Sequence, residues 1–212
     1  LLAIGIAIII GGLFGLFISE FQKAAKPTLG LVNFLYTIPS ISMLGFLIPF
    51  SGVGNATAVI ALTVYALLPM VRNTYTGMTN VDPAILEAAK GMGSTRMQIL
   101  FRIRLPLAMP VIMSGIRSMV TMTIALAGIA SFIGAGGLGV AIYRGITTNQ
   151  AAITMAGSLL TALLALVMDF LFGFIERRMT KRSARAKRTN RILGFAALIL
   201  LLAFVFAAAL RQ

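Results

Sequence analysis

The chain has 212 residues, a formal net charge of +13 and a mean hydropathy of +0.99, and 59% of its residues are hydrophobic. It contains no cysteine, histidine or tryptophan. This excludes a disulfide framework, thiolate or imidazole metal sites, and a Trp-lined cage for a cation. Several apolar runs are about 20 residues long, enough to cross the hydrocarbon layer of a bilayer as a helix. These features predict an all-α membrane domain.

Six apolar runs are expected to span the membrane, which makes the chain a polytopic transmembrane helical domain. They cover residues 1–19, 28–50, 56–76, 108–131, 151–175 and 192–210. Most of the 18 Lys and Arg residues lie in the stretches 20–27, 72–104 and 177–191, which six spans place on one side. Cytoplasmic loops carry the excess of Lys and Arg, so this side is predicted to be cytoplasmic. The charge therefore indicates topology rather than nucleic-acid binding, with anionic lipid headgroups as a secondary partner of 177–191.

Prolines interrupt the second and third spans. Pro27 is expected to open the second span at its first helical turn. Further along, the sequence TIPS contains Pro39, and Pro49 and Pro69 follow. A proline inside a helix removes one backbone hydrogen bond and usually kinks the helix. Each of these three prolines is interpreted either as a packing kink or as a hinge or lining of a pathway.

The stretch between the third and fourth spans is too polar for lipid, and it is predicted to form two short helices. Asp82 followed by Pro83 is typical of a helix start, because Asp accepts hydrogen bonds from free N–H groups and Pro fits the first helical position. Gly91 and Gly93 are expected to end this first helix.

The second short helix is expected after a glycine bend. Thr95 with Gln98 three residues later resembles a capping box, and Pro106 is expected to end the helix. Before the bend, the charged Glu87 and the small residues Ala88 and Ala89 form a compact knob. The knob is either an interfacial loop or a shape that fits a groove on another protein.

This segment resembles a known signature. From Glu87-Ala88-Ala89 the pattern continues without a gap through Gly93 to Ile103 and Leu105-Pro106, and it is similar to the "EAA" signature of ABC importer permeases. The resemblance implies a type I ABC importer permease fold with about six spans. In that family the loop is the coupling helix, which sits in a cleft of the cytoplasmic ATPase and transmits its closure to the membrane helices.

The resemblance also implies roles and partners. The residues that it assigns to coupling are Asp82, Pro83, Glu87, Ala88, Ala89, Gly93 and Pro106. It implies a permease that is not an enzyme and holds no cofactor, because ATP and Mg are bound by the partner ATPase. The implied partners are an ATPase dimer, a second permease copy, an extracellular substrate-binding domain, fused or separate, and the lipid of a bacterial cytoplasmic membrane.

Four further segments are similar to the osmoprotectant branch of these permeases, which takes up glycine betaine, choline and carnitine. They are YTIPSISMLGFLIP (36–49), LPMVRNTYTGM (68–78), LPLAMPVIMSGIRS (105–118) and SFIGAGGLG (131–139). Three alternatives stay open: an importer of an amino acid or another zwitterion such as ergothioneine or methionine, an ATP-independent channel or carrier, and a membrane anchor for an outer receptor domain.

The domain organisation follows from the spans and the resemblance. Residues 1–176 are expected to form the core permease, with the coupling helices at 82–105. Residues 177–191 form a basic cytoplasmic linker, and 192–212 an extra C-terminal transmembrane helix. Some members of the branch fuse the binding domain to the permease through such a span. We therefore expect an extracellular binding domain after Gln212, with an accessory helix and nothing after it as the alternative.

The glycine-rich segment 134–139 is not a phosphate-binding loop, because no Lys-Ser or Lys-Thr follows it and no strand precedes it. It is expected to be an outer turn where two spans reverse, or part of an outer gate through Gly136 and Gly137. Tyr36, Tyr65 and Phe46 either pack in the core or line a path for a quaternary ammonium ion, which binds to aromatic faces.

Two charged residues lie inside apolar runs. Arg117 in the fourth span and Asp169 in the fifth are both predicted about 12–16 Å from the inner boundary. Charged groups inside a membrane are costly and are usually paired. We expect an ion pair between them, the alternative being that each side chain reaches the cytoplasmic surface separately.

Overall fold

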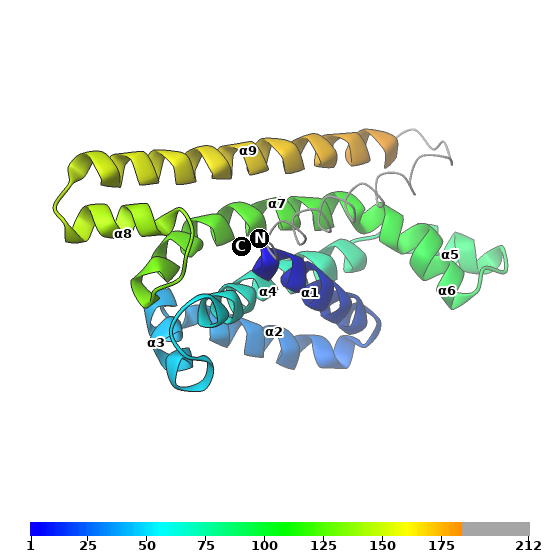
Figure 1. Ribbon diagram of the computed structural model, residues 1–212. Helices are drawn as coiled ribbons and strands as arrows, with labels where there is room; N and C mark the ends of the chain where they lie inside the picture. The colour runs from blue at the N-terminus through cyan, green and yellow to red at the C-terminus, as the bar shows by residue number, and fades with distance from the viewer. Residues whose placement is uncertain (184–212) are drawn as a thin grey trace.

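The computed structural model describes residues 1–183, which form an all-α bundle (Figure 1). The long helices are α1 (Leu2–Glu20), α4 (Asn55–Thr79), α7 (Leu105–Ile129) and α9 (Ala151–Ser183). The shorter elements are α2 (Gln22–Thr37), α3 (Ser40–Ser51), α5 (Pro83–Gly91), α6 (Arg96–Ile99), the π turn η1 (Leu100–Arg104), the 3-10 turn η2 (Ala130–Ile133) and α8 (Gly139–Thr147). Figure 1 shows α5 and α6 at one end of the bundle and α3 and α8 at the other.

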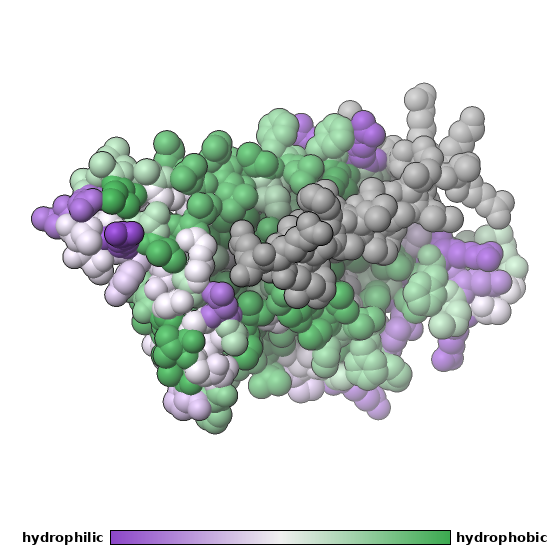
Figure 2. Space-filling view, viewed as in Figure 1, coloured by the Kyte–Doolittle hydropathy of each residue, from purple (hydrophilic) through white to green (hydrophobic). Residues whose placement is uncertain are grey.

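Four helical segments of the described chain are long and apolar enough to cross a membrane. They are Leu2–Glu20, Asn55–Thr79, Arg96–Ile133 and Ala151–Met179, and α2 with α3 makes a fifth if the two count as one bent span. Figure 2 shows hydrophobic side chains over the middle of the molecule and hydrophilic ones toward its ends. Five of the six predicted spans thus have counterparts, and the sixth, 192–210, lies outside the described residues. The predicted boundary at 176 falls inside α9, which runs on through the first basic residues to Ser183.

Helix α4 is the centre of the bundle, and glycines bring its neighbours close to it. A Cβ atom added at Gly15 of α1 would lie 2.5 Å from the Cβ of Thr74 and 2.9 Å from the carbonyl oxygen of Val71. A Cβ at Gly115 of α7 would lie 2.3 Å from the Cβ of Asn73. Small residues allow this approach, which in lipid supplies the packing contacts that hold helices together.

The second predicted span is broken rather than kinked. Helices α2 and α3 meet at an angle of 97°. Ile38 is extended, with φ −68° and ψ 127°, because the residue before a proline avoids the helical region, and Pro39 cannot donate a backbone hydrogen bond. Pro49 lies inside α3 and Pro69 inside α4, so of the three prolines only Pro39 separates two helices.

The predicted position of Pro27 is wrong. Helix α2 starts at Gln22, so this proline lies inside the helix and not at its first turn. As the sixth residue of α2, Pro27 lies beyond the first four N–H groups that have no partner in a helix, so it removes one hydrogen bond of the second turn.

The prediction that Pro106 ends the second short helix is also wrong. Helix α6 continues through η1 into α7, where Pro106 is the second residue. The amide of Leu105 donates to the carbonyl of Leu100, five residues back. In an α-helix a proline ring clashes with the carbonyl four residues before it, and the wider π turn directly before Pro106 relieves that clash.

The outer turn after α7 is longer than predicted. The two spans do not reverse at one turn, because α8 first folds back against α9 (Figure 1). A Cβ at Gly145 would lie 2.3 Å from Oγ1 of Thr154, and one at Gly157 would lie 2.9 Å from the amide nitrogen of Ile142. One glycine on each helix therefore permits the contact that holds α8 in place.

We predict that Gly15→Ala destabilises the bundle by about 1–3 kcal/mol, because the added methyl group meets the backbone of α4 and the two helices must separate. The measurement is the midpoint of thermal unfolding in detergent. The matched control is Gly5→Ala on the same helix, where a Cβ has nothing within 4 Å. Equal midpoints for the two variants would contradict the role assigned to the close contact.

Candidate functional site

The projection formed by α5 and α6 starts as the sequence predicts. The carboxylate oxygen Oδ1 of Asp82 accepts a hydrogen bond of 2.9 Å from the amide of Ala84. Pro83 is the first residue of α5. The side chain of Asp82 therefore caps the free N–H groups at the helix start.

A glycine turn ends α5. Gly93 has φ +80°, a region that other residues rarely adopt. The amide of Ser94 donates to the carbonyl of Ala89 at 3.1 Å, and the amide of Gly93 donates to the carbonyl of Lys90 at 2.9 Å. These two bonds are the hydrogen-bond pattern of a Schellman motif. Gly91 is the last residue of the helix, so Gly93 alone supplies the reversal.

The predicted capping box after the bend is confirmed. The amide of Gln98 donates to Oγ1 of Thr95 at 3.3 Å, and the amide of Thr95 donates to Oε1 of Gln98 at 2.8 Å. The bend between α5 and α6 is thus fixed on both sides by local hydrogen bonds.

The surface of this projection is part charged and part apolar. Glu87 and Ala88 are exposed, whereas Ala89 is 1% exposed and packs inward. Large apolar side chains are exposed beside them: Ile85, Met92, Met97 and Phe101. Met97 and Phe101 also belong to the candidate span Arg96–Ile133, whereas Ile85 and Met92 lie on α5 and directly after it.

Arg104, at the end of η1, connects three elements, and sequence analysis assigned it no role. Its guanidinium donates through Nη1 to Oε1 of Glu20, the last residue of α1, and through Nη2 to the carbonyl of Met78 at 3.3 Å, near the end of α4. The side chain of Arg104 is only 15% exposed. The chain has five acidic residues, and this scarcity is the signal that could have marked Glu20 as half of a specific pair.

Arg117 and Asp169 form the ion pair that the sequence predicts. Nε of Arg117 lies 2.6 Å from Oδ1 of Asp169, and Nη2 lies 2.7 Å from Oδ2. This two-pronged geometry is the strong form of an arginine–carboxylate contact. The third nitrogen, Nη1, lies 3.3 Å from Oε2 of Glu176, a second carboxylate that sequence analysis missed.

A glycine makes room for this pair. A Cβ at Gly173 would lie 3.0 Å from Cζ of Arg117. Asp169, Gly173 and Glu176 are spaced by four and three residues, which places them on one face of α9. The guanidinium of α7 therefore lies along α9 between two carboxylates, and the spacing is the signal that could have revealed Glu176.

Two tyrosines meet at the break between α2 and α3. The rings of Tyr36 and Tyr65 are 5.9 Å apart in an edge-to-face arrangement. The hydroxyl of Tyr65 donates to the carbonyl of Ile38, directly before Pro39, and the hydroxyl of Tyr36 lies 3.2 Å from Sδ of Met122 on α7. Tyr65 is 6% exposed and Tyr36 is 41% exposed.

Phe46, grouped with these tyrosines in the sequence analysis, lies elsewhere. It is 67% exposed, and its ring contacts Phe50 one turn further along α3, at a centroid distance of 5.6 Å. The structure therefore brings together two of the three aromatic residues considered for a solute path.

The two outer loops touch each other. The amide of Gly136 donates to Oδ1 of Asn55 at 2.8 Å, and a Cβ at Gly134 would lie 3.4 Å from Val53. Gly134 and Gly137 have positive φ angles of 75° and 109°. A hydrogen bond to the side chain of Asn55 thus joins the start of α4 to the loop that follows α7, and the positive φ angles at Gly134 and Gly137 shape that loop.

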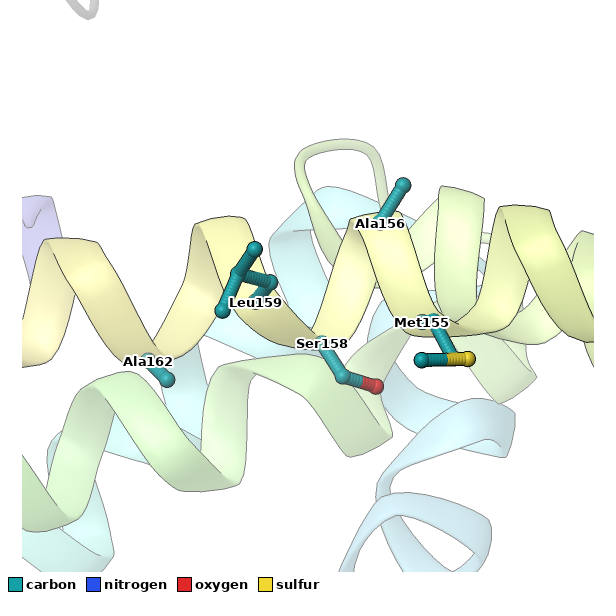
Figure 3. A pocket seen from close by; sticks show the side chains of 5 residues that line it. All are labelled: Met155, Ala156, Ser158, Leu159 and Ala162. Atoms are coloured by element: carbon teal, nitrogen blue, oxygen red, sulfur yellow. The ribbon is translucent and has the colours of Figure 1, made fainter.

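Other features of the described residues offer no site for chemistry. No group of three or more Asp and Glu side chains within residues 1–183 is placed to hold a metal ion. A shallow depression on α9 is lined by Met155, Ala156, Ser158, Leu159 and Ala162 (Figure 3). All five side chains come from one helix and only Ser158 is polar, so no set of polar groups converges there as in a solute site.

Comparison with known proteins places these features in a family. The model of the binding-protein-dependent transport system inner membrane component matches residues 3–181. The carnitine transport permease protein OpuCB of Listeria monocytogenes is 41% identical over 82% of this chain and 80% of that protein. The osmoprotectant import permease protein OsmW of Salmonella typhimurium is 42% identical, over 87% and 88%.

A third relative and a solved structure match a similar share of this chain. The glycine betaine/carnitine/choline transport system permease protein OpuCD of Bacillus subtilis is 40% identical, over 89% of this chain and 82% of that protein. A chain from the inward-facing MetNI methionine ABC transporter superposes with a TM-score of 0.68, at 24% identity, over 82% of this chain and 91% of that one. That likeness shows the fold.

We predict that reversing the charge at Arg117 or at Asp169 alone lowers the yield of monodisperse protein and its unfolding midpoint. Arg117→Asp gathers three carboxylates in one membrane region. Asp169→Arg places a second guanidinium group against that of Arg117, so two positive charges repel each other. The double exchange, R117D with D169R, restores opposite charges and should recover part of the loss. The recovery is incomplete because Glu176 then faces a carboxylate. A double variant no better than the worse single variant would contradict the pairing.

Proposed function

This chain belongs to the family of binding-protein-dependent transport system inner membrane components, and on that premise we propose that it imports small compatible solutes such as glycine betaine, choline and carnitine. As a member of the family it is a multi-pass permease of the bacterial inner membrane, it is not an enzyme, and it binds no cofactor. The observation that supports the substrate class is the identity of 40–42% to permeases whose names give carnitine, glycine betaine with carnitine and choline, or osmoprotectants.

The permease works in a complex with an ABC ATPase, which binds ATP and Mg. We propose that two copies of this chain sit on an ATPase dimer and that α5 enters a cleft of each ATPase subunit. The projection of α5 and α6 from one end, with apolar side chains exposed on a polar surface, supports this arrangement. The proposed coupling residues are Asp82, Pro83, Glu87, Ala88, Ala89, Gly93 and Pro106.

The contacts of this segment suggest how force passes from it to the membrane helices. ATP binding closes the ATPases and moves α5. Through the continuous run of α6, η1 and α7, the movement reaches the fourth span directly. Through Arg104 it reaches the ends of α1 and α4, because that guanidinium bonds to Glu20 and to the carbonyl of Met78. The spans then change from inward-facing to outward-facing.

The solute path and its outer end are further parts of the proposal. Tyr36, Pro39 and Tyr65 lie together at the break in the second span, where a path through the membrane needs polar surface. Gly136 and Gly137 belong to the loop that contacts Asn55. We assign this contact to an outer gate that faces the binding protein.

The domain organisation is proposed as follows. Residues 1–176 form the core permease, 177–191 a basic linker on the cytoplasmic side, and 192–212 a sixth span. A basic stretch before an apolar run of this length places the far end of the run outside. That is the side on which a substrate-binding domain delivers solute, so we propose that this span connects the permease to such a domain.

Two competing functions make different predictions. An importer for another zwitterion, such as ergothioneine or methionine, keeps the coupling segment and changes only the solute. An ATP-independent channel or carrier has no use for a capped projection whose bend depends on Gly93.

The test of the proposed function is uptake of labelled glycine betaine into proteoliposomes that hold the permease, its ATPase and its substrate-binding domain. We expect saturable uptake that requires ATP on the ATPase side, and competition by choline and carnitine. ATP hydrolysis without betaine entry would leave the importer assignment intact and overturn the solute class. Flux that is the same without ATP would overturn the importer assignment itself.

A second prediction separates the bend from the helix. Gly93→Ala places a side chain at φ +80° and should cost about 1–2 kcal/mol at that residue, so α5 loses its orientation and ATPase binding and uptake both fall. Gly91→Ala lies two residues away inside the helix, where a Cβ has nothing within 4 Å. It should leave both activities near the wild-type level. Equal effects of the two substitutions would argue against a fixed bend as the coupling element.

A further inference from the structure

The break between α2 and α3 lies at membrane depth. The hydroxyl of Tyr65 bonds to the carbonyl of Ile38 at this break. Tyr65 is ten residues from the outer end of α4, about 15 Å along the helix and thus near the middle of a hydrocarbon layer about 30 Å thick. Non-helical backbone at that depth occurs only where protein covers it or where it lines a water-filled cavity.

One face of α2 at the break is polar although it is exposed in the single chain, and the exposed apolar residues Phe34 and Ile41 lie beside it. Asn33, Tyr36 and Thr37 are exposed on α2. Ser118 and Ser114 are exposed on α7. They lie one and two helical turns before Met122, which contacts Tyr36. Polar residues inside a membrane face a bundle interior or a water-filled path rather than lipid. This surface therefore belongs to the solute path rather than to the lipid boundary.

Tyr36 stays exposed although both its ring and its hydroxyl have contacts. The hydroxyl is engaged with Sδ of Met122 at 3.2 Å, yet the residue keeps 41% of its surface exposed. Tyr65 supports the ring from the buried side. Contacts with Tyr65 and Met122 thus orient Tyr36, while part of the residue stays accessible.

The neighbouring hydroxyl groups offer acceptors. Oγ of Ser118 donates to the carbonyl of Ser114 at 3.1 Å, so its proton is used and its lone pairs face outward. The carbonyls of Tyr36 and Thr37, the last two residues of α2, have no partner within the helix and are further acceptors at the break. An aromatic ring beside oxygen acceptors, without a carboxylate, suits a cation that carries no N–H group.

We propose that Tyr36, with Ser118 and Met122, forms a contact site in the solute path for the quaternary ammonium group of the transported compound. This proposal rests on the proposed function, since it takes its ligand from that solute class. A quaternary ammonium group spreads its charge over methyl groups, so it binds to aromatic faces and cannot use the directional acceptors that a primary amine needs. The site selects among solutes during transport and is separate from the binding domain.

The first test compares uptake by the complete transporter with Tyr36→Leu, Tyr36→Phe and Phe34→Leu. Phe34 is 65% exposed on another side of α2 and is the matched control for loss of an aromatic ring. We expect Tyr36→Leu to reduce the maximal rate of glycine betaine uptake about three- to tenfold. Uptake of any transported solute with a primary or secondary ammonium group should fall less, because its N–H donors can bond to oxygen acceptors. Tyr36→Phe keeps the ring and should stay within about twofold of wild type, as should Phe34→Leu.

The outcomes separate the site from the function. Wild-type uptake of glycine betaine with no greater loss in Tyr36→Leu than in Phe34→Leu would overturn the site and leave the proposed function standing. Wild-type protein that takes up no quaternary ammonium compound would overturn the solute class and the site with it. A loss in Tyr36→Leu that is equal for all solutes would mean a structural role for the ring and would also overturn the site.

A second test does not depend on the stability of a Tyr36 variant. The chain has no cysteine, so Ser118→Cys and Phe34→Cys each introduce a single thiol. A methanethiosulfonate reagent that carries a quaternary ammonium group should modify Ser118→Cys, and glycine betaine present during turnover should slow that reaction. Phe34→Cys should react slowly and without protection. Equal rates at the two positions, or no protection at position 118, would overturn the proposal.

Discussion

Close approach between helices at glycine is the constraint on which this structure depends. In lipid, apolar surface gains nothing by leaving solvent, so helices hold together through packing and polar contacts. Gly15 lets α1 reach the backbone of α4, and Gly115 lets α7 close over Asn73. These contacts fix α4 between its neighbours. The fixed helix then presents Tyr65 to the break at Ile38 and the carbonyl of Met78 to Arg104.

Three of the few acidic residues pair with arginines, in two different ways. Arg117 is held by both oxygens of Asp169 and by Glu176, and Gly173 lets the guanidinium lie flat on α9. This contact makes α7 and α9 one unit. Arg104 makes a single bond to each of its two partners, and those partners belong to two different helices. These two contacts can break independently, which fits the movement between helices that the proposed coupling requires.

The sequence predicted those structural features whose hydrogen bonds join residues close together in the chain. The Asp82 cap, the turn at Gly93 and the Thr95–Gln98 box each involve groups within five residues, and all were predictable. The Arg117 pair followed from the cost of charge in lipid. Prolines were harder, because Pro39 breaks a span while Pro49 and Pro69 do not. The break at Pro39 leaves the carbonyl of Ile38 outside a helix, and the hydroxyl of Tyr65 on α4 donates to it. This partner comes from another helix and could not be predicted from neighbouring residues. Helix α8 was missed for the same reason, since its glycine contact with α9 is tertiary.

A contact site inside a permease must be weak, and the surroundings of Tyr36 have that property. A solute must enter the path and also leave it, so a site of high affinity would stop transport. A cage of several rings holds a quaternary ammonium ion tightly, whereas here one open ring meets it beside hydroxyl and carbonyl oxygens. Tyr65, which would be the second ring, is 6% exposed and is used to hold the break. The proposed site would therefore discriminate between solutes by the nature of their charged group, and high-affinity capture would be the task of the proposed binding domain.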